Sequence, residues 1–419
     1  MFKPISISLS PNTEKDDIFL ALKLLFQPQH WKARENNSLL IEERFKEYLG
    51  VKHTFSFNSG RSALMAILDS LRLKDKDEIL LQAFTCNAAV NPIIGAGLKP
   101  VFVDIDDSLN LDLEDLKRRI TPRSRVVMVQ HNFGWPARIE EISKVAKENN
   151  LFLVEDCAHS LGAEFKNRFC GTFGEAAFFS FGRDKIISSV FGGMAVASNE
   201  KMGERLKEFQ EKLDCPSNFW IFQQLLHPIL MNWKIMPAYA IHSFLGRIIL
   251  GAFHRLSVLS KGVYKVEKKG EIPPQFPKQF PNALAILALN QFKKLERFNA
   301  HRREIADFYE KELKGFNLPL AKSQEGIKPT FMRYPVLINK ETDNILRESR
   351  KRRIYLDDAW RKSVVIPSDT DIRKMKYISG SCPKAERVAK SILNLPTHIN
   401  ISKREAEKIV EFIKEYGPR

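Results

Sequence analysis

The stretch LFLVEDCAHSLGAEFKNRFCGTFGEAAFFSFGRDKIISSVFGGMAVAS, residues 151–198, decides the fold of this 419-residue chain. Short runs of apolar, aromatic or β-branched residues alternate in it with glycines and polar residues, and these runs span residues 151–154, 176–181 and 194–197. Such runs, bounded by turn-forming residues, predict three β-strands. Asp156 closes the first run, and Lys185 follows the second by four residues.

These two ionisable side chains fit the chemistry of pyridoxal 5′-phosphate (PLP). A lysine amine can form a Schiff base with the aldehyde of this cofactor. A carboxylate can keep the pyridine nitrogen protonated, so that the ring accepts electrons. Lys185 and Asp156, each near the end of a predicted strand, would supply both roles.

The segments EDCAHSLGA and FFSFGRDKIISSVFGGMAV resemble the DegT/DnrJ/EryC1/StrS family of sugar aminotransferases, and the similarity extends over most of the chain. That family has the fold of type I PLP proteins, with an Asp-x-x-(Gln or His) strand end and a Ser-Phe-x-x-x-Lys loop before a Gly-Gly strand. The resemblance implies an α/β fold, in which a large three-layer domain with a mostly parallel central sheet is joined to a small α+β C-terminal domain. The matching motif residues are Asp156, His159, Ser180 and Lys185.

The resemblance also implies a role for each motif residue. Lys185 would hold the cofactor and shuttle protons, His159 would lie near the phenolic oxygen of PLP, and Ser180 would bind its phosphate. Each has a structural alternative: a solvated lysine, a histidine bonded to backbone, or a serine capping a turn. Because Lys185 stands between the apolar runs FFSF and IISSVFGG, where an unpartnered ammonium would be costly to bury, the catalytic role is favoured.

The segment FSFNSGRSALMAILDSL, residues 55–71, predicts a strand, a glycine turn and an apolar helix. Such a turn leaves free backbone N–H groups at the positive end of the helix dipole, where a phosphate can bind. The family usually has Ser-Gly-Thr here to bind the PLP phosphate, and this chain has Gly60, Arg61 and Ser62 at the turn. Arg61 would add a charge-assisted contact. The alternative is an N-capped core helix without a ligand.

Three more residues are candidates for the site. Cys86 stands where the family places a side chain over the PLP ring, and its alternative is an ordinary buried thiol. His131 ends a predicted strand at the edge where open α/β sheets bind ligands, so it is either a substrate residue or a structural histidine. Arg183, in the loop before Lys185, is the other candidate substrate residue.

Helical periodicity predicts continuous helices over residues 14–50, 108–122 and 283–315, with Gly50 and Gly315 as the ends of the first and last. The family resemblance implies that the N-terminal helix packs against a second subunit, so we expect a homodimer. We also expect four parts of the chain: an entry segment (1–50), a large PLP-binding domain (51–213), an aromatic-rich insertion and linker (214–280), and a long interdomain helix with the small C-terminal domain (281–419).

Residues 214–264 depart from the family pattern. They are rich in Trp, Phe, Ile and Leu, but no apolar run of about 18 residues is present, so a membrane-spanning helix is not expected. Two or three helices here would either pack within the chain or on a partner subunit, which we favour, or lie on a membrane surface. The proline-rich linker that follows lacks the family's Gly-x-Asn-x-Arg motif, for which Gln279 and Asn282 are only weak substitutes.

The composition limits the other possibilities. The formal net charge is +16, but basic and acidic residues alternate along the helical stretches, so we expect no nucleic-acid partner. A positive field would instead favour a substrate with a diphosphate. The five cysteines are irregularly spaced and form no CxxC pair, which predicts reduced thiols in a cytoplasmic protein without a metal site. No secretory signal is visible at the N-terminus.

The sequence therefore predicts a PLP-dependent aminotransferase. Its amino donor would be glutamate, and its acceptor a nucleotide-linked keto sugar used in cell-surface polysaccharide or secondary-metabolite synthesis. One alternative is a PLP-binding protein without turnover that acts in regulation or in assembly at a membrane. Another is a different PLP enzyme, such as a sugar dehydratase or an amino-acid aminotransferase, which Arg61, Cys86 and the missing asparagine motif keep open.

Overall fold

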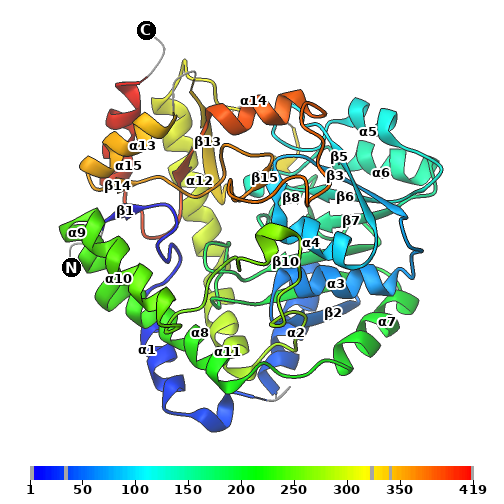
Figure 1. Cartoon of the computed structure of the whole chain (residues 1–419), viewed down its shortest axis with the longest axis horizontal. Helices are drawn as coiled ribbons and strands as arrows, with labels where there is room; N and C mark the ends of the chain where they lie inside the picture. The colour runs from blue at the N-terminus through cyan, green and yellow to red at the C-terminus, as the bar shows by residue number, and fades with distance from the viewer. Residues whose placement is uncertain (1–3, 33–35, 321–324, 339–341, 417–419) are drawn as a thin grey trace.

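The computed structural model describes residues 4–32, 36–320, 325–338 and 342–416 (Figure 1). Within these residues, the centre of the molecule is a seven-stranded sheet of order β2-β11-β10-β7-β6-β3-β5. Neighbouring strands pair in parallel from β10 to β5, while β11 is antiparallel to both β10 and β2. The strand bounds are His53–Phe57 (β2), Gly193–Ala197 (β11), Ala176–Ser180 (β10), Phe152–Asp156 (β7), Ser124–Gln130 (β6), Glu78–Gln82 (β3) and Lys99–Val103 (β5).

The three strands predicted between residues 151 and 198 are β7, β10 and β11, so the α/β class with a mostly parallel sheet is confirmed. Successive side chains of β10 enter different cores: Phe178 belongs to one buried cluster and Phe179 to another. Both faces of the sheet are therefore covered, as in other parallel sheets. The helices that follow these strands are α3 (Gly60–Ser70), α4 (Asn87–Gly95), α5 (Leu113–Arg119), α6 (Ile139–Glu148) and α7 (Glu200–Glu211).

Three predicted helices are shorter than expected. The N-terminal one is divided into α1 (Lys15–Leu25), a 3-10 turn at Pro28–His30 and α2 (Asn36–Leu49), and residues 33–35 of the prediction lie outside the described residues. Gly50 does follow α2 with a positive φ of 67°, as predicted.

The prediction for 108–122 is wrong at its start, because α5 begins only at Leu113. The carboxylate of Asp106 accepts backbone N–H bonds from Ser108 and Asn110, which makes a turn of that stretch. Asp112 then caps α5 by accepting the N–H of Asp115 at 2.8 Å.

The long helix expected over 283–315 is two helices, α11 (Asn282–Phe292) and α12 (Leu295–Glu312). The break falls at Lys294, whose ammonium lies 3.0 Å from Asp17 of α1 and also contacts Asp16. α12 ends three residues before Gly315, so that glycine is not its terminus.

The C-terminal region is built around the antiparallel pair β13 (Arg333–Leu337) and β16 (Ile392–Pro396). The N-terminus of the chain completes it, since β1 (Ile5–Ser6) pairs in parallel with β14 (Ile354–Tyr355). One buried cluster includes residues from both α3 and the C-terminal helix, so the two regions share a core. The proposed division at residues 50, 213 and 280 stays a prediction. The helices of this region are α13 (Thr342–Lys351), α14 (Pro383–Ser391) and α15 (Lys403–Lys414). Two short strands pair with strands from earlier in the chain: β12 (Ile327–Lys328) with β8 (Glu164–Phe165), and β15 (Val365–Ile366) with β4 (Thr85–Cys86). β8 also pairs with β9 (Arg168–Phe169).

The insertion forms a run of helices along one edge of the molecule (Figure 1): α8 (Asn218–Leu230), the π-helical turn η3 (Met231–Ile235), α9 (Met236–Ile241) and α10 (Ser243–Arg255). α8 packs against α1 and α11 in the same chain, and its residues Trp220, Ile221 and Leu225 share a buried cluster with them. Among the described residues, no helix is long and apolar enough to cross a bilayer.

Candidate active site

A cavity of about 320 Å³ lies where the parallel strands reach their carboxyl ends. Gln130 ends β6, Asp156 ends β7 and Ser180 ends β10, and all three line it. Of the ten residues predicted for the site, the structure brings eight to this cavity: Gly60, Arg61, Cys86, Asp156, His159, Ser180, Arg183 and Lys185.

The N-terminus of α3 forms one end of the cavity. Gly60 lies so close to β10 that an added Cβ would stand 2.9 Å from Cβ of Ser180. Gly193 approaches equally closely, because a Cβ there would be 2.4 Å from the backbone nitrogen of Gly60. The first N–H groups of a helix have no partner within it and carry partial positive charge. Beside the Ser180 hydroxyl they form a seat for an anion.

Ser62 is not part of this seat. It is fully buried outside the cavity, and its hydroxyl donates to Oδ1 of Asn58 at 2.7 Å. Ser59 lines the cavity instead and caps α3 by accepting the N–H of Ser62 at 3.1 Å. The N-cap was weighed in the sequence only as an alternative to a ligand site, whereas Ser59 both caps the helix and lines the cavity.

Asp156 and Lys185 line the same cavity. Asp156 is buried, and its Oδ1 accepts the N–H of Ala158 at 3.0 Å. Burial raises the pKa of this carboxyl to about 6, although the nearby Lys185 ammonium opposes the rise. At neutral pH the Asp156 carboxylate is therefore an anion held at some cost, and a cationic partner would stabilise it.

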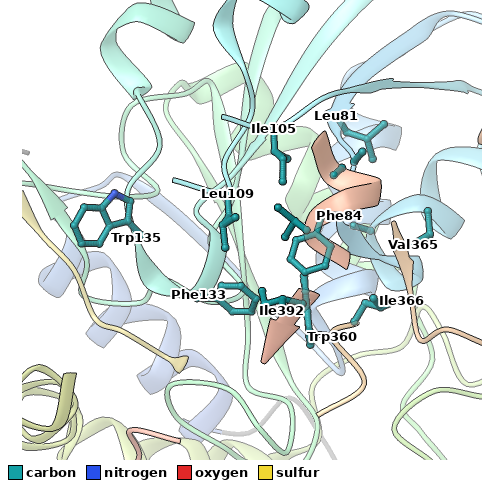
Figure 2. Close-up of a cluster of buried hydrophobic side chains, with 14 of the residues drawn as sticks. Leu81, Phe84, Ile105, Leu109, Phe133, Trp135, Trp360, Val365, Ile366 and Ile392 are labelled. Atoms are coloured by element: carbon teal, nitrogen blue, oxygen red, sulfur yellow. The ribbon is translucent and has the colours of Figure 1, made fainter. Parts of the chain in front are cut away.

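His159 is buried against Phe133 and Trp360, two members of the hydrophobic cluster drawn in Figure 2. Its ring centroid lies 5.9 Å from that of Phe133 and 4.9 Å from that of Trp360, and Trp360 in turn packs edge-on against Phe84. Burial holds the pKa of His159 well below its usual value, so the ring is neutral. Because Nδ1 accepts the N–H of Phe133 at 3.4 Å, the ring proton is assigned to Nε2. His159 is therefore a neutral hydrogen-bond donor.

The loop that carries Lys185 is held by two buried arginines from the C-terminal half of the chain. Arg302 of α12 donates to the carbonyl of Ile186 at 2.8 Å and to Asn12, whose own amide donates to the carbonyl of Lys185. Arg333 of β13 forms ion pairs with Asp184 and with Asp358, the latter at 2.8 Å. Sequence reading identified neither arginine, since their partners in the Lys185 loop, Ile186 and Asp184, are more than a hundred residues away.

Arg183 lines the cavity with an unusually free guanidinium group. Its Nη2 donates to Oγ of Ser260 at 2.6 Å, and its Cζ lies 5.3 Å from the ring centroid of Phe191. No partner for its Nε is found in the described part of the chain. Burial lowers the pKa of Arg183 to about 10. The group is a desolvated cation available to an anionic ligand.

Arg61 differs from Arg183, because its charge is compensated within the chain. Its guanidinium pairs with the fully buried Glu267, lies 4.7 Å from the ring centroid of Phe276 and donates to the carbonyl of Gly262 at 3.1 Å. Glu267 therefore competes with a phosphate for the guanidinium of Arg61, for which the sequence predicted a phosphate contact.

His131 lies outside the cavity and is a structural residue. Its Nε2 is 3.1 Å from Glu155, and its Nδ1 accepts the N–H of Ala137 at 3.0 Å. Glu155 also accepts backbone N–H bonds from residues 171, 173 and 174. The strand-end position suggested a ligand, but the side chain instead bonds to Glu155 of β7 and to the backbone of Ala137.

Neither suggested substitute for the missing asparagine motif lines the cavity. Asn282 is buried, and its amide donates to the carbonyl of His30 at 2.9 Å. The residues that sequence reading missed at the cavity include Ser8, Ser59, Gln130, Asp184, Asp358 and Trp360.

The residues present fit PLP. The cavity has the volume of a small cofactor site, with an anion seat at one end and a buried carboxylate that forms no ion pair within 4.0 Å among the described residues. Lys185, Cys86 and His159 line the space with them. An amine, a carboxylate, an anion seat and a neutral donor are the groups that bind PLP.

Comparison with known proteins agrees with this geometry. The model of the DegT/DnrJ/EryC1/StrS aminotransferase family matches residues 12–214 and 261–414, which leaves out most of the insertion. An uncharacterized protein of Methanocaldococcus jannaschii is 29% identical over 92% of this chain and 91% of its own. GDP-perosamine synthase of Escherichia coli O157:H7 is 25% identical over 92% of each chain.

Among solved structures, the Helicobacter pylori aminotransferase PseC, which is involved in the biosynthesis of pseudoaminic acid, superimposes with a TM-score of 0.72. It covers 99% of both chains at 22% identity, so this likeness supports the fold. The family match spans most of the chain and includes the strand ends and the lysine loop of the cavity. The chain therefore belongs to the DegT/DnrJ/EryC1/StrS aminotransferase family and is a PLP-dependent transaminase.

Proposed function

We propose that this protein transfers the amino group of a donor such as glutamate to a keto group on a nucleotide-linked sugar. The observation that carries the proposal is that Lys185, Asp156 and the N-terminus of α3 meet at one cavity. The sugar substrate is supported by relatives such as GDP-perosamine synthase, whose name denotes a nucleotide-linked amino sugar. Use of the product in polysaccharide or secondary-metabolite synthesis is part of the same proposal.

Each residue of the cavity has a proposed task. The backbone N–H groups at Gly60 and Arg61 and the hydroxyl of Ser180 would hold the PLP phosphate. Asp156 would pair with the pyridine nitrogen, and Cys86 would lie against the ring. His159 would donate from Nε2 to the phenolic oxygen.

When bound, PLP supplies an aldehyde for covalent attachment and a ring that withdraws electrons. Lys185 would provide the attaching amine. With the donor bound, Nζ of Lys185 would accept the proton from Cα of the donor and deliver it to the cofactor carbon that carried the aldehyde; in the second half-reaction it would move a proton from that carbon to the sugar carbon. Trp360 and Phe191, which also line the cavity, would limit the access of water.

Arg183 would bind an anionic group of a substrate. Its side chain lines the cavity without a carboxylate partner at hydrogen-bonding distance among the described residues, unlike Arg61. Both the donor's carboxylates and the diphosphate of the sugar nucleotide have the required charge.

We also propose that the protein is a homodimer that associates through α1 and α2. Two aromatic side chains of this region are largely exposed, Phe19 by 61% and Phe26 by 79%. Leu39 and Leu40 of α2 are almost half exposed as well. Large exposed apolar groups that lie together mark protein interfaces.

Replacing Lys185 tests the proposed chemistry. Lys185→Ala should abolish the visible absorption band of bound PLP and lower the transamination rate by about a hundredfold or more. Lys185→Arg should behave in the same way, although it keeps the charge. The exposed Lys201→Ala is the matched control. Activity would be measured with glutamate and a panel of GDP-, UDP- and TDP-linked keto sugars. A band that persists in Lys185→Ala would show that another lysine holds PLP.

Asp156→Asn should stabilise the PLP-free protein while it removes activity. Folding raises the pKa of this carboxyl from 3.8 to about 6. The carboxyl therefore adds to the free energy of unfolding only at low pH, where it is protonated, and this contribution is lost as the pH rises to about 6. Above pH 6 the variant should therefore be more stable than the wild type by up to about 3 kcal/mol, and below about pH 4 the two should be equal.

Asp184→Asn is the control with the opposite sign. Burial alone would raise the pKa of Asp184, but Lys185 and Arg333 outweigh it and lower the pKa, so this variant should be less stable at neutral pH. Urea denaturation of PLP-free protein from pH 4 to pH 8 measures both effects. Equal losses of stability in the two variants at pH 8 would contradict the assignment of Asp156.

Arg183→Gln should raise the KM of the substrate whose anion it binds by about tenfold to a hundredfold, the value of a hydrogen bond to a charged group. Arg183→Lys should recover part of this loss. If only the KM of the amino donor rises, Arg183 binds the donor's carboxylate. If only the KM of the sugar nucleotide rises, Arg183 binds its diphosphate. Unchanged KM values for both substrates would remove Arg183 from the binding site.

Replacing Phe19 and Phe26 together by serine should convert the protein from a dimer to a monomer, because each ring contributes apolar area to the proposed interface. Sedimentation velocity measures the change. Ile378→Ser is the control, since Ile378 is 75% exposed but lies elsewhere. A double variant that sediments like the wild type would place the interface on another face.

A further inference from the structure

The insertion has an unusual charge. Residues 215–266 contain no aspartate or glutamate, although the whole chain has 50 acidic residues in 419. The same stretch contains five basic residues: Lys234, Arg247, Arg255, Lys261 and Lys265. No acidic side chain of this segment therefore offsets its basic ones.

Helix α10 is apolar on its outer face as well as on its inner face. Gly246 packs on Tyr239, where an added Cβ would be 2.2 Å from the ring, and Leu250 and Phe253 pack on the same small cluster. On the opposite side are exposed apolar residues at helical spacing: Phe244 (60%), Leu245 (39%), Ile248 (50%) and Leu256 (71%). A helix face that meets only water is normally polar, so this outer face requires an apolar partner.

Cations accompany the outer face. Arg247 and Arg255 lie on α10 itself and are exposed, and Lys234 is exposed in η3. None of the three has a carboxylate partner within 4.0 Å among the described residues. The apolar side chain of Ile241, which is 67% exposed, extends the face at the end of α9. Apolar groups flanked by unpaired cations suit a surface that is anionic outside and apolar beneath.

The position of α10 agrees with such a partner. α9 and α10 lie at the rim of the molecule, at the side opposite α5 and α6 (Figure 1). The family model leaves out residues 215–260, so this face is an addition to the part of the chain that the family shares. The homodimer proposed above is assigned to a different helix pair, α1 and α2.

A second copy of the chain is a poor occupant of this face. A two-fold interface brings the same patch of both subunits together, so Arg247 and Arg255 would face the cations of the partner with no carboxylate from the insertion to neutralise them. An anionic lipid surface, in contrast, attracts each nearby Lys or Arg. Its acyl chains would receive the apolar side chains.

We propose that the outer face of α10, together with Ile241, binds a membrane surface that carries anionic lipids. The helix lies in the plane of the interface, with Phe244 and Ile248 below the headgroups and Arg247 and Arg255 beside lipid phosphates. The protein is thereby attached to the membrane from one side. This binding is independent of the transaminase reaction.

Co-sedimentation of the PLP-loaded, full-length protein with lipid vesicles tests the proposal. Wild-type protein should bind vesicles of phosphatidylcholine with phosphatidylglycerol, and should bind vesicles of phosphatidylcholine alone much less. High salt should weaken the binding, because it screens exposed charges. Phe244→Ser with Ile248→Ser should reduce the partition coefficient by roughly tenfold or more, since two exposed apolar side chains lose their burial in lipid.

Two further variants sharpen the test. Arg247→Gln with Arg255→Gln should reduce binding to the anionic vesicles and remove most of its salt dependence. Phe19→Ser with Phe26→Ser, on the proposed dimer face, should leave vesicle binding intact. Because all the changed side chains of α10 are exposed, these variants should keep the melting temperature and the transaminase activity of the wild type.

Failure of wild-type protein to bind anionic vesicles would overturn the proposal. So would equal binding by the α10 variants. If instead the α10 variants sediment as a smaller species than the wild type in the absence of lipid, a second copy of the chain covers this face and the membrane assignment is wrong.

Discussion

The placement of Lys185 depends on two buried guanidinium groups. Arg302 and Arg333 are each 1% exposed, and both act on the loop between β10 and β11. A charge removed from water is costly unless nearby groups compensate it, so the two arginines favour loop conformations that keep these contacts. Both arginines come from the C-terminal half of the chain. The reactive amine is therefore held in position only when the whole chain is folded around the sheet.

The strands and most of the cavity were predictable from sequence because their signals are local. Apolar runs that end in Asp156 or Ser180 define strand ends, and parallel strands bring such ends to one edge of a sheet. The glycine turn before α3 was visible for the same reason. Gly60 of this turn packs so closely on β10 that a larger side chain would not fit there.

Sequence could not show which partner a side chain or a helix meets in the fold. Arg61 was expected at a phosphate, but Glu267, 206 positions away, takes its charge. His131 has a strand-end position like that of Asp156, and only the fold shows that Glu155 and Ala137 occupy its ring nitrogens. The break between α11 and α12 likewise coincides with the acidic residues of α1, which periodicity within a helix cannot detect.

The end of the insertion contributes to the cavity as well as to the surface. Ser260 holds Arg183, while Gly262 and Val263 line the space beside it. Ser260 lies outside the family match and Gly262 and Val263 lie just inside it, so the part of the chain that departs from the family reaches the binding site through Ser260. Substrate choice depends on such local shape and charge, whereas the fold is compatible with many substrates.

Pairing of β1 with β14 has a consequence for biosynthesis. Ile354 is made 349 residues after its neighbour Ile5. At a translation rate of about 5–20 residues per second, the first strand must wait roughly 20–70 seconds for its partner. During that interval β1 has no partner strand, and it stays open to chaperones until the residues of β14 have been made.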